Sequence, residues 1–297
     1  MNIIAVVVTY NRKELLKRNI TCLRANTPGS SIVVVNNGST DGTGEWLDDQ
    51  KDLTVIHQEN VGGSGGFYRG IQYAYQAGAD WIWCMDDDVF PRADCMEHLL
   101  PYTHAGVGIL APRRLMEGQI FTNDFQKVNL TNPFASMYQQ KLKGRVIDSP
   151  VDICGTAFEG LCISREAVER IGLPNKELFI FCDDTDYCLR AVLAGFRILY
   201  IPSALMDKEK FFSDDDWETR SRKKKWKRFY QVRNAAYLNH RYGKNWAVRY
   251  LRSFHAVLGY IVIALATIPF KDVYTLDDVA KFWKAYRDGI LEKLGKL

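Results

Sequence analysis

Short apolar runs alternate with amphipathic helical stretches through the first third of the chain. The runs are rich in β-branched or aromatic side chains, as buried strands are, and they span Ile3–Val8, Ile32–Val35, Leu53–His57 and Trp81–Met85. Leu16, Ile20 and Leu23 follow helical spacing in a stretch that ends at Thr27-Pro28-Gly29, and Phe67–Gln76 predicts a second helix. The repetition of strand, loop and helix predicts an α/β fold with a parallel sheet.

Polar clusters follow the predicted strands directly. Thr9-Tyr10-Asn11 comes after the first run, Asn36–Gly42 after the second, and Asp86–Asp88 after the fourth. Parallel α/β sheets bind ligands beyond the carboxyl ends of their strands. The first half of the chain is therefore predicted to build a ligand site at that edge.

The second half of the chain is less regular. Its pattern predicts strands at Leu110–Arg113, Gln119–Phe121, Val146–Ile153 and Phe158–Ile163, a helix at Arg165–Ile171, and a last strand at Arg197–Ile201 that ends at Pro202. From Trp217 the sequence is basic, aromatic and helical. We expect a main domain over 1–212 and a helical region over 213–297.

The composition is that of an ordinary globular protein, with 47% of the 297 residues hydrophobic and 25% charged. Seven cysteines, an odd number with no Cys-x-x-Cys pair, favour free thiols in a reducing cytosol over disulfides or a zinc site. No charged leader with an apolar segment opens the chain, so we do not expect a secretory signal peptide.

The net charge of +4 is divided unevenly. Residues 217–297 carry 18 Lys and Arg against 6 Asp and Glu, a balance of +12 that leaves −8 on the first 216 residues. The acidic part can hold a cation, and the basic part suits an anionic surface or substrate.

Asp86-Asp87-Asp88 is the strongest chemical signal. Three adjacent carboxylates repel one another, so folding them together is costly unless a cation neutralises them. A solvated acidic loop is the plain alternative, but this triplet ends an apolar strand, where ligands bind in such sheets. Because hard oxygen ligands suit Mn²⁺ or Mg²⁺, we expect one of these ions there.

The segment Asn60–Gly66 has four glycines in five residues and precedes a predicted helix. Glycine lets a backbone approach a ligand closely, and a helix N-terminus favours anions, so we expect Asn60, Gly62 and Gly63 to contact a ligand. Arg69, one turn into the helix, is placed to meet a phosphate or a base. A flexible turn is the alternative. The position after the third strand argues against a P-loop or a dinucleotide fingerprint.

Asp183-Asp184-Thr185-Asp186 follows the apolar run Leu178–Cys182. A carboxylate exposed after such a run can act as a general base, and an Asp before a helix can cap its free amides. Both roles can hold in one cluster, and we expect one of these aspartates to be catalytic.

The C-terminal region combines a basic and an apolar segment. Arg220–Arg228 contains seven Lys and Arg around Trp226, and Ala256–Phe270 carries no charge. A spanning helix needs about 20 apolar residues, so the apolar stretch is expected to be buried or interfacial. A solvated helix face and a nucleic-acid patch also fit the basic segment, but the neighbouring apolar stretch favours a membrane surface. We expect a cytoplasmic protein, peripheral on the inner face of the cell membrane, with no nucleic-acid partner.

Taken in order, four motifs resemble those of the inverting family 2 glycosyltransferases, which have the GT-A fold. They are Val-Val-Thr-Tyr-Asn-Arg, Val-Val-Asn-Asn-Gly-Ser-Thr-Asp, Asn-Val-Gly-Gly-Ser-Gly-Gly and Asp-Asp-Asp. The resemblance covers residues 1–210 and continues more weakly into Arg228–Asn234. Within the family, Gly-Gly-Ser-Gly-Gly-Phe-Tyr-Arg-Gly and Met-Asp-Asp-Asp look most like galactofuranosyltransferases, with rhamnosyltransferases as near relatives. The resemblance implies a GT-A catalytic domain with a Rossmann-like, mostly parallel sheet, followed by a helical extension.

The resemblance also implies roles for single residues. Thr9, Asn11 and Asn36 would line a uridine pocket, with Arg69 and Asp86 beside it, and Asp87 and Asp88 would face the ribose, the diphosphate and the metal. Asn36 departs from the commoner Asp, and an amide still pairs with a uracil edge. Asp184 matches the catalytic base in Phe-Ile-x-x-x-Asp-x-Asp/Glu. Family members often place a metal-binding His after the last strand, and Asp207 is the nearest match, so Asp88 and Asp207 are the expected metal ligands.

The implied reaction is transfer of galactofuranose from UDP-galactofuranose to a glycan or a polyprenyl-linked glycan, in bacterial cell-surface polysaccharide synthesis. One carboxylate base suffices for inversion, because a metal neutralises the leaving diphosphate and no protein acid is needed. The alternatives are a rhamnosyltransferase that uses dTDP-rhamnose and a non-catalytic membrane-associated scaffold of the same fold. A nucleotidyltransferase is disfavoured because Thr9-Tyr10-Asn11 occupies the place of its glycine- and arginine-rich loop.

Overall fold

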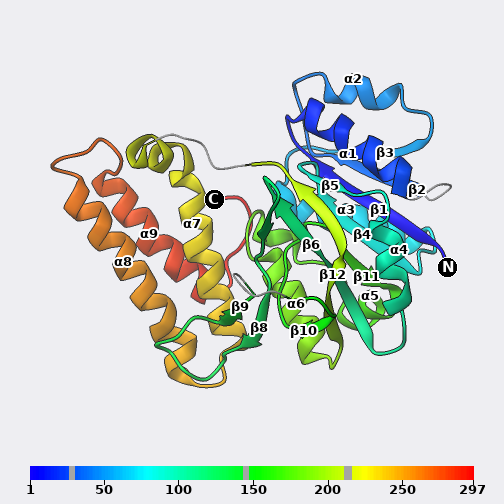
Figure 1. Ribbon diagram of the computed structural model, residues 1–297. Helices are drawn as coiled ribbons and strands as arrows, with labels where there is room; N and C mark the ends of the chain where they lie inside the picture. Colours follow the sequence, from blue (N-terminus) through cyan, green and yellow to red (C-terminus); the bar gives the residue numbers. More distant parts are fainter. Residues whose placement is uncertain (27–30, 143–146, 211–215) are drawn as a thin grey trace. The chain divides into compact units, whose positions relative to one another are not determined.

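The computed structural model of the protein describes residues 1–26, 31–142, 147–210 and 216–297 (Figure 1). These residues form two compact units. The first comprises Met1–Lys127, Gln140–Lys176 and Asp183–Lys210. The second comprises Val128–Gln139, Glu177–Cys182 and the C-terminal region from residue 216. The expected boundary at 212/213 lies outside the described residues.

The first unit is built on a mixed, mostly parallel sheet. Its strands run in the order β10-β12-β6-β11-β4-β1-β2-β3, with β5 paired to β12 and β7 to β6. Their bounds are β1 Ile3–Thr9, β2 Ser31–Asn36, β3 Leu53–His57, β4 Trp81–Asp86, β5 Val89–Pro91, β6 Val107–Met116, β7 Gln119–Phe121, β10 Val151–Ile153, β11 Leu161–Ser164 and β12 Arg197–Lys208. The β1–β2, β1–β4, β2–β3 and β6–β12 pairs are parallel, and β11 is antiparallel to both neighbours.

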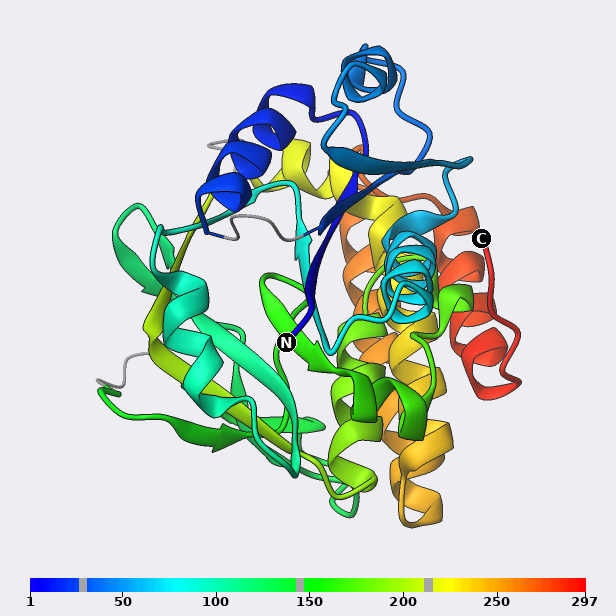
Figure 2. The ribbon, with the colours of Figure 1, turned by 90° about the vertical axis from the view of Figure 1, so that its right-hand side faces the viewer.

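Both faces of this sheet are covered, because the strands are apolar on both sides. Ile4, Val6 and Val8 of β1 belong to the core under α3, α5 and α6, while Ile3, Ala5 and Val7 belong to the core under α1 and α4. α1 and α3 lie on either side of β1 in Figure 2. The helices are α1 Lys13–Asn26, α2 Thr43–Asp48, α3 Gly62–Gln76, α4 Cys95–Leu99, α5 Arg165–Ile171 and α6 Asp183–Leu193. The expected end of the first helix at Thr27–Gly29 lies outside the described residues.

The glycines of α3 serve packing more than the sequence suggested. The helix begins at Gly62, so the predicted loop is its first turn. A Cβ on Gly66 would lie 2.5 Å from Val8 Cγ1, and one on Gly70 would lie 2.3 Å from Val6 Cγ1. Glycine therefore allows α3 to approach β1 closely, and Gly63, whose Cβ direction is open, is the position that leaves room for a ligand.

β12 is longer than predicted, and its extension carries part of the site. The strand was expected to end at Pro202, but it continues to Lys208 through a register shift between Ile201 and Leu205. A proline without a ladder hydrogen bond is tolerated at such a bulge. The extension pairs with β5, so that Lys208 lies opposite Val89, directly after the Asp86–Asp88 triplet.

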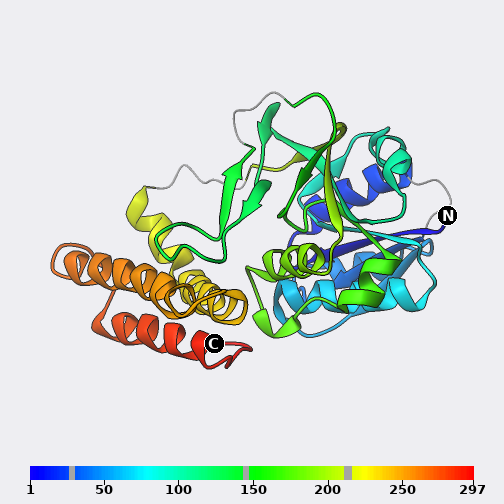
Figure 3. The same ribbon diagram turned by 90° about the horizontal axis from the view of Figure 1, so that it is seen from below.

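The second unit contains the predicted helical region. α7 Trp217–Tyr242 begins at the cap Asp216, whose carboxylate accepts from Thr219 N at 2.7 Å. A π-helical turn, η3 Ala247–Leu251, leads into α8 Arg252–Thr267, and α9 Leu276–Ile290 follows. The three long helices lie side by side in Figures 1 and 3 and share a core that includes Val232, Val257 and Phe282. β8 Phe125–Val128 and β9 Tyr138–Lys141 form a hairpin through which the chain passes between the units.

Candidate active site

The Asp86–Asp88 triplet is held by donors of the protein itself. Asp87 accepts from the Thr9 hydroxyl at 2.7 Å through Oδ2 and from Arg12 Nη1 at 3.3 Å through Oδ1. Asp88 accepts from the same Arg12 nitrogen at 2.9 Å through Oδ2 and from Lys208 Nζ at 3.0 Å through Oδ1. All four carboxylate oxygens of Asp87 and Asp88 are thus engaged by hydrogen bonds.

Lys208 begins a chain of charges that runs into the core. Its ammonium lies 2.8 Å from Glu159 as well as 3.0 Å from Asp88, and only 3% of its side chain is exposed. Glu159 in turn lies 2.8 Å from Arg114, which contacts both oxygens of the buried Asp124 at 2.7 Å. Burial alone would lower the pKa of Lys208, but Glu159 and Asp88 outweigh it and raise that pKa, so the side chain is a permanent cation.

The carboxylates of the triplet are hard to ionise together. Burial and then Asp88 raise the pKa of Asp86 well above its ordinary value, against the opposing effect of Lys208. Burial raises the pKa of Asp87 to about 6, although Arg12 and Thr9 lower it. Ionised carboxylates are poorly solvated in this buried site and repel one another, so cations beside them are needed to keep them charged.

Asp183 and Asp184 form the first turn of α6, as the sequence predicted for a helix there. Burial, and then the neighbouring Asp183, raise the pKa of Asp184 to about 7. Burial raises the pKa of Asp183 to about 6, and the Ser64 hydroxyl opposes the rise. Glu159 raises the pKa of both Asp184 and Asp86, so the two carboxylate clusters belong to one electrostatic site.

The segment that precedes Asp183 has an unusual backbone. Phe179, Phe181 and Cys182 have φ values of 65°, 66° and 67°, a region that non-glycine residues rarely adopt. Asn234 of α7 donates from Nδ2 to the carbonyls of Leu178 at 3.0 Å and Ile180 at 2.9 Å. A strained conformation persists where surrounding contacts determine it, and such strain clusters at functional sites.

The residues expected to line a base pocket lie at the ends of β1, β2 and β3. Asn11, with φ 54°, accepts from Thr40 N at 2.7 Å and so links the loop after β1 to the loop after β2. Asn36 Nδ2 lies 3.1 Å from His57 Nδ1, and its Oδ1 accepts from Ser39 N. The structure therefore brings Asn11 and Asn36 together around one polar edge of the sheet.

The glycine-rich turn lies beside this edge. Asn60 Oδ1 accepts from Gly62 N at 3.0 Å, and Asn37 donates to Gly62 O at 3.0 Å. Arg69 is exposed and donates to Gln72 of its own helix at 2.9 Å. Its contact with a phosphate or base stays a prediction.

The structure does not bring Asp207, which was expected to be a metal ligand, together with Asp88. Successive residues of a strand point to opposite faces, and Lys208 is the one that faces Asp88. Asp207 forms two hydrogen bonds with Arg92, at 2.9 and 3.1 Å, and lies near Cys22 of α1, whose pKa burial raises and Asp207 raises further.

The sequence pattern did not lead us to three residues of the site, Arg12, Glu159 and Lys208. Arg12 was part of a noted motif but received no role. Glu159 lay inside a predicted strand, whereas β11 begins only at Leu161. Lys208 would have been found if the strand had been continued past Pro202.

A model of the family described as Glycosyl transferase family 2 matches residues 4–171. The chain belongs to glycosyl transferase family 2. Galactofuranosyltransferase GlfT1 of Mycolicibacterium smegmatis is 26% identical over 247 residues, which are 79% of this chain and 82% of that protein. Polyprenol monophosphomannose synthase of the same organism is 25% identical over 212 residues, 69% of this chain and 78% of that protein. The dTDP-rhamnosyl transferase RfbF of Shigella flexneri is 28% identical over 213 residues, 69% and 68% of the two chains.

Solved structures identify this family 2 protein as a GT-A fold. GalNAc-T7 with UDP, GalNAc and Mn²⁺ has a TM-score of 0.58 at 14% identity and covers 92% of this chain and 58% of its own. The mannosyltransferase PcManGT from Pyrobaculum calidifontis, in complex with GDP-Man and Mn²⁺, has a TM-score of 0.52 at 14% identity. The match covers 98% of this chain and 88% of that protein's chain. Both of these complexes contain Mn²⁺.

The residues of this chain do not fit a metal ion in the arrangement that they adopt. The oxygens of Asp87 and Asp88 are engaged by Thr9, Arg12 and Lys208. Within the part of the chain that the structure describes, no group of three or more His, Cys, Asp or Glu side chains is arranged to hold an ion.

Proposed function

We propose that this family 2 glycosyltransferase transfers a sugar, with inversion, from a nucleoside diphosphate to a hydroxyl of a glycan or lipid-linked glycan. The first candidate donor is UDP-galactofuranose, the second dTDP-rhamnose. The resemblance to GlfT1 over most of both chains supports the first, and the resemblance to RfbF over about two thirds of both chains supports the second. Uracil and thymine present the same pairing edge to Asn36, so the base pocket does not separate them.

The observation that carries the proposal is the raised pKa of Asp184 in the same site as the triplet. Its pKa of about 7 is that of a carboxylate able to accept a proton near neutral pH, where general bases are most effective. It lies in the same electrostatic site as the triplet, through Glu159. Retention of these carboxylate clusters also argues against a scaffold without activity.

The reaction follows from one base and one leaving group. Asp184 takes the proton of the acceptor hydroxyl, the hydroxyl oxygen forms a bond to the anomeric carbon, and the bond from that carbon to the diphosphate oxygen breaks. The electron pair leaves with the diphosphate, and attack from the opposite face inverts the anomeric centre. Cationic groups beside the diphosphate stabilise the charge that develops there.

A peripheral position on the inner face of the cell membrane is part of the proposal. Residues Ala247–Thr267 form one helix long and apolar enough, by length and composition, to cross a membrane. Leu258, Val262 and Leu265, which share one face of α8, are 38%, 62% and 47% exposed. Such a face suits insertion into the boundary between lipid headgroups and tails.

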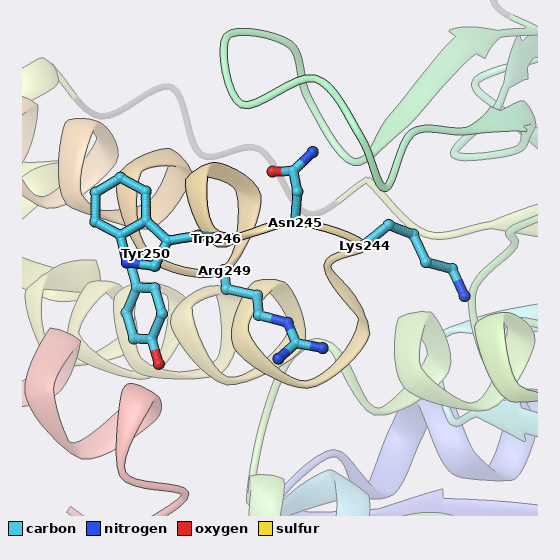
Figure 4. Close-up of a pocket in the computed structure, with 5 residues that line it drawn as sticks. All are labelled: Lys244, Asn245, Trp246, Arg249 and Tyr250. Carbon is cyan, nitrogen blue, oxygen red and sulfur yellow. The ribbon is translucent and has the colours of Figure 1, made fainter.

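A pocket at the start of this helix supports the same position. It has a volume of about 430 Å³ and is lined by Lys244, Asn245, Trp246, Arg249 and Tyr250 (Figure 4). The rings of Trp246 and Tyr250 lie 6.0 Å apart. A lining with two cations, Lys244 and Arg249, and two aromatic rings suits an anionic lipid headgroup or the phosphate of a lipid-linked acceptor.

A donor screen tests the function. The purified protein is incubated with UDP-galactofuranose, dTDP-rhamnose, UDP-galactose and GDP-mannose, with and without a polyprenyl-linked acceptor, and nucleoside diphosphate release is measured. We expect release from one of the first two donors to rise with acceptor. No release from any donor, with Mn²⁺, with Mg²⁺ or without either, would contradict the proposal.

A further inference from the structure

Two cations of the chain lie on the carboxylates where a metal was expected. Lys208 engages Oδ1 of Asp88, and Arg12 engages Oδ2 of Asp88 together with Oδ1 of Asp87. Their combined charge equals that of one divalent ion. We propose that Arg12 and Lys208 supply the positive charge at the donor diphosphate, so that donor binding and transfer need no metal ion. This inference rests on the proposed glycosyltransferase function.

The ammonium of Lys208 is buried in the site and paired with two carboxylates. It is held between Asp88 at 3.0 Å and Glu159 at 2.8 Å, with 3% of the side chain exposed. A metal ion bound to Asp88 would compete with this ammonium for the carboxylate and would place a second positive charge beside it. Removing one partner from a buried ion pair is strongly unfavourable, so the arrangement favours the lysine over an exchangeable ion. Lys208 acts through Asp88 and is a positioning residue.

Arg12 is the group that reaches the diphosphate. It follows the Thr9-Tyr10-Asn11 turn, and 46% of its side chain is exposed while Asp87 and Asp88 beneath it are buried. Both of its contacts with the triplet use Nη1. A guanidinium carries five N–H donors in a planar fork that matches phosphate oxygens, so Arg12 can hold the triplet with one arm and the diphosphate with the other.

The charges and protons of the reaction balance with these residues. When the bond between the anomeric carbon and the diphosphate oxygen breaks, the electron pair and one unit of negative charge pass to the diphosphate, and the acceptor proton is on Asp184. Arg12 and Lys208 keep their protons throughout. Arg12 acts by electrostatic stabilisation of the leaving group, which a fixed cation supplies without reorganisation, and Lys208 supports it by neutralising Asp88.

The first test is the metal dependence of the wild-type protein. Metal-stripped protein is assayed for transfer, and for UDP affinity by calorimetry, in EDTA and in excess Mn²⁺. We expect both quantities to agree within about twofold between the two conditions, and Mn²⁺ alone to show no binding by electron paramagnetic resonance, since Asp88 is already paired. A stimulation of transfer by Mn²⁺ of about tenfold or more, or stoichiometric Mn²⁺ binding, overturns the inference while leaving the function intact. Absence of transfer in both conditions overturns the proposed function itself.

Substitution of Arg12 tests whether this residue supplies positive charge to the diphosphate. Arg12→Gln is expected to weaken UDP binding in EDTA by about tenfold or more, the loss of one charge-assisted contact. Arg24→Gln is the matched control, because Arg24 is a similarly exposed α1 residue, 39% exposed, that pairs with Asp52. Equal UDP affinity in Arg12→Gln and Arg24→Gln overturns the role of Arg12.

Lys208→Met removes the buried cation, and Lys208→Arg keeps it. We expect the first to lower kcat in EDTA by about tenfold or more and the second to retain most of the rate, with Lys210→Met, at a surface pair with Glu117, unchanged. If Lys208→Met fails to fold, the variant Lys208→His provides a second test. An imidazole beside Asp88 and Glu159 completes a ligand set that suits Mn²⁺, so this variant is expected to become stimulated by Mn²⁺ where the wild type is not. A Lys208→His protein as indifferent to Mn²⁺ as the wild type would contradict the placement of Lys208 at the cation position.

Discussion

The side-chain nitrogen of Asn234 donates to the carbonyl oxygen of Phe181 at 2.9 Å, three residues before Asp184. Phe181 has a left-handed backbone, as do Phe179 and Cys182. The same nitrogen also reaches the carbonyls of Leu178 and Ile180. The Asn234 amide, together with Arg233, which donates to the carbonyl of Leu178 at 3.0 Å, thus holds the strained segment that precedes the proposed base.

Asn234→Ala is therefore expected to lower kcat by about tenfold or more while UDP affinity stays within about twofold, because a small misplacement of a reacting group is costly. The matched control is Asn239→Ala on the same helix, which removes a buried hydrogen bond to Ser253 at 2.8 Å but touches no part of the segment. Steady-state kinetics and calorimetry on both variants give the comparison. An equal loss of kcat in the two would show that Asn234 only stabilises the helix.

The pH dependence of transfer follows from Asp184. Its raised pKa, about 7, means that the carboxylate is protonated and inactive as a base below that value and ionised above it. We expect kcat to rise with pH through about 7 and then to level off. A kcat that is constant between pH 5.5 and 8.5 would exclude an ionising base with this pKa.

The sequence predicted the sheet well because buried strands are short apolar runs that can be recognised without the structure. β3, β7 and α5 have the predicted bounds, and β1, β2 and β4 extend by one or two residues. β5 and α4 were missed because, at three and five residues, they are too short to show a period. Thr9, Asn36 and Asp86–Asp88 were singled out because each ends or follows an apolar strand, and their roles in binding stay predictions.

The rest of the site depends on contacts that no local pattern encodes. Asp207 and Lys208 are neighbours, and only the pairing of β12 with β5 decides which of them faces Asp88. The glycines of Asn60–Gly66 were assigned to ligand approach, whereas a Cβ on Gly66, like one on Gly70 further along α3, would meet a β1 side chain. Asn234 lies far along the chain from the segment it holds, so its role needed the tertiary structure.

The buried Arg114–Asp124 pair is expected to matter for stability. Both side chains are at most 1% exposed, and their closest approach is 2.7 Å. Asp124→Ala would leave a buried guanidinium with only part of its partners, which costs about 3–5 kcal/mol of unfolding free energy. Asp152→Ala, which removes the exposed pair with Arg197, is the control and should cost about 1 kcal/mol or less. Urea unfolding measures both, and similar losses would contradict the importance of burial.

Membrane binding is expected to depend on α8 and on part of the basic segment. Lys225 contacts Asp278 at 2.8 Å, and Arg228 contacts Tyr274, so these two cations hold the helices together. Leu258→Ser with Val262→Ser is expected to weaken binding to anionic vesicles, measured by sedimentation, by about a hundredfold or more, since each buried apolar side chain contributes about 1.5–3 kcal/mol.

Lys223→Gln with Lys224→Gln is expected to weaken the same binding and to reduce its salt dependence, because each cation near an anionic leaflet contributes about 1 kcal/mol. Ile120→Ser, at an exposed position of β7, serves as the control. Wild-type protein that stays in the supernatant with anionic vesicles at low salt would exclude the membrane position.

The assignment of Asp184 as the base is tested most directly by Asp184→Asn, in which a near-isosteric amide cannot accept the acceptor proton. Transfer is measured in a single turnover, and UDP-sugar affinity by calorimetry. We expect the rate to fall by about 10²–10⁴-fold with donor affinity within about twofold, and Asp183→Asn to lose much less. Transfer by Asp184→Asn at more than about a tenth of the wild-type rate, or the same loss in both variants, would show that Asp184 is not the base.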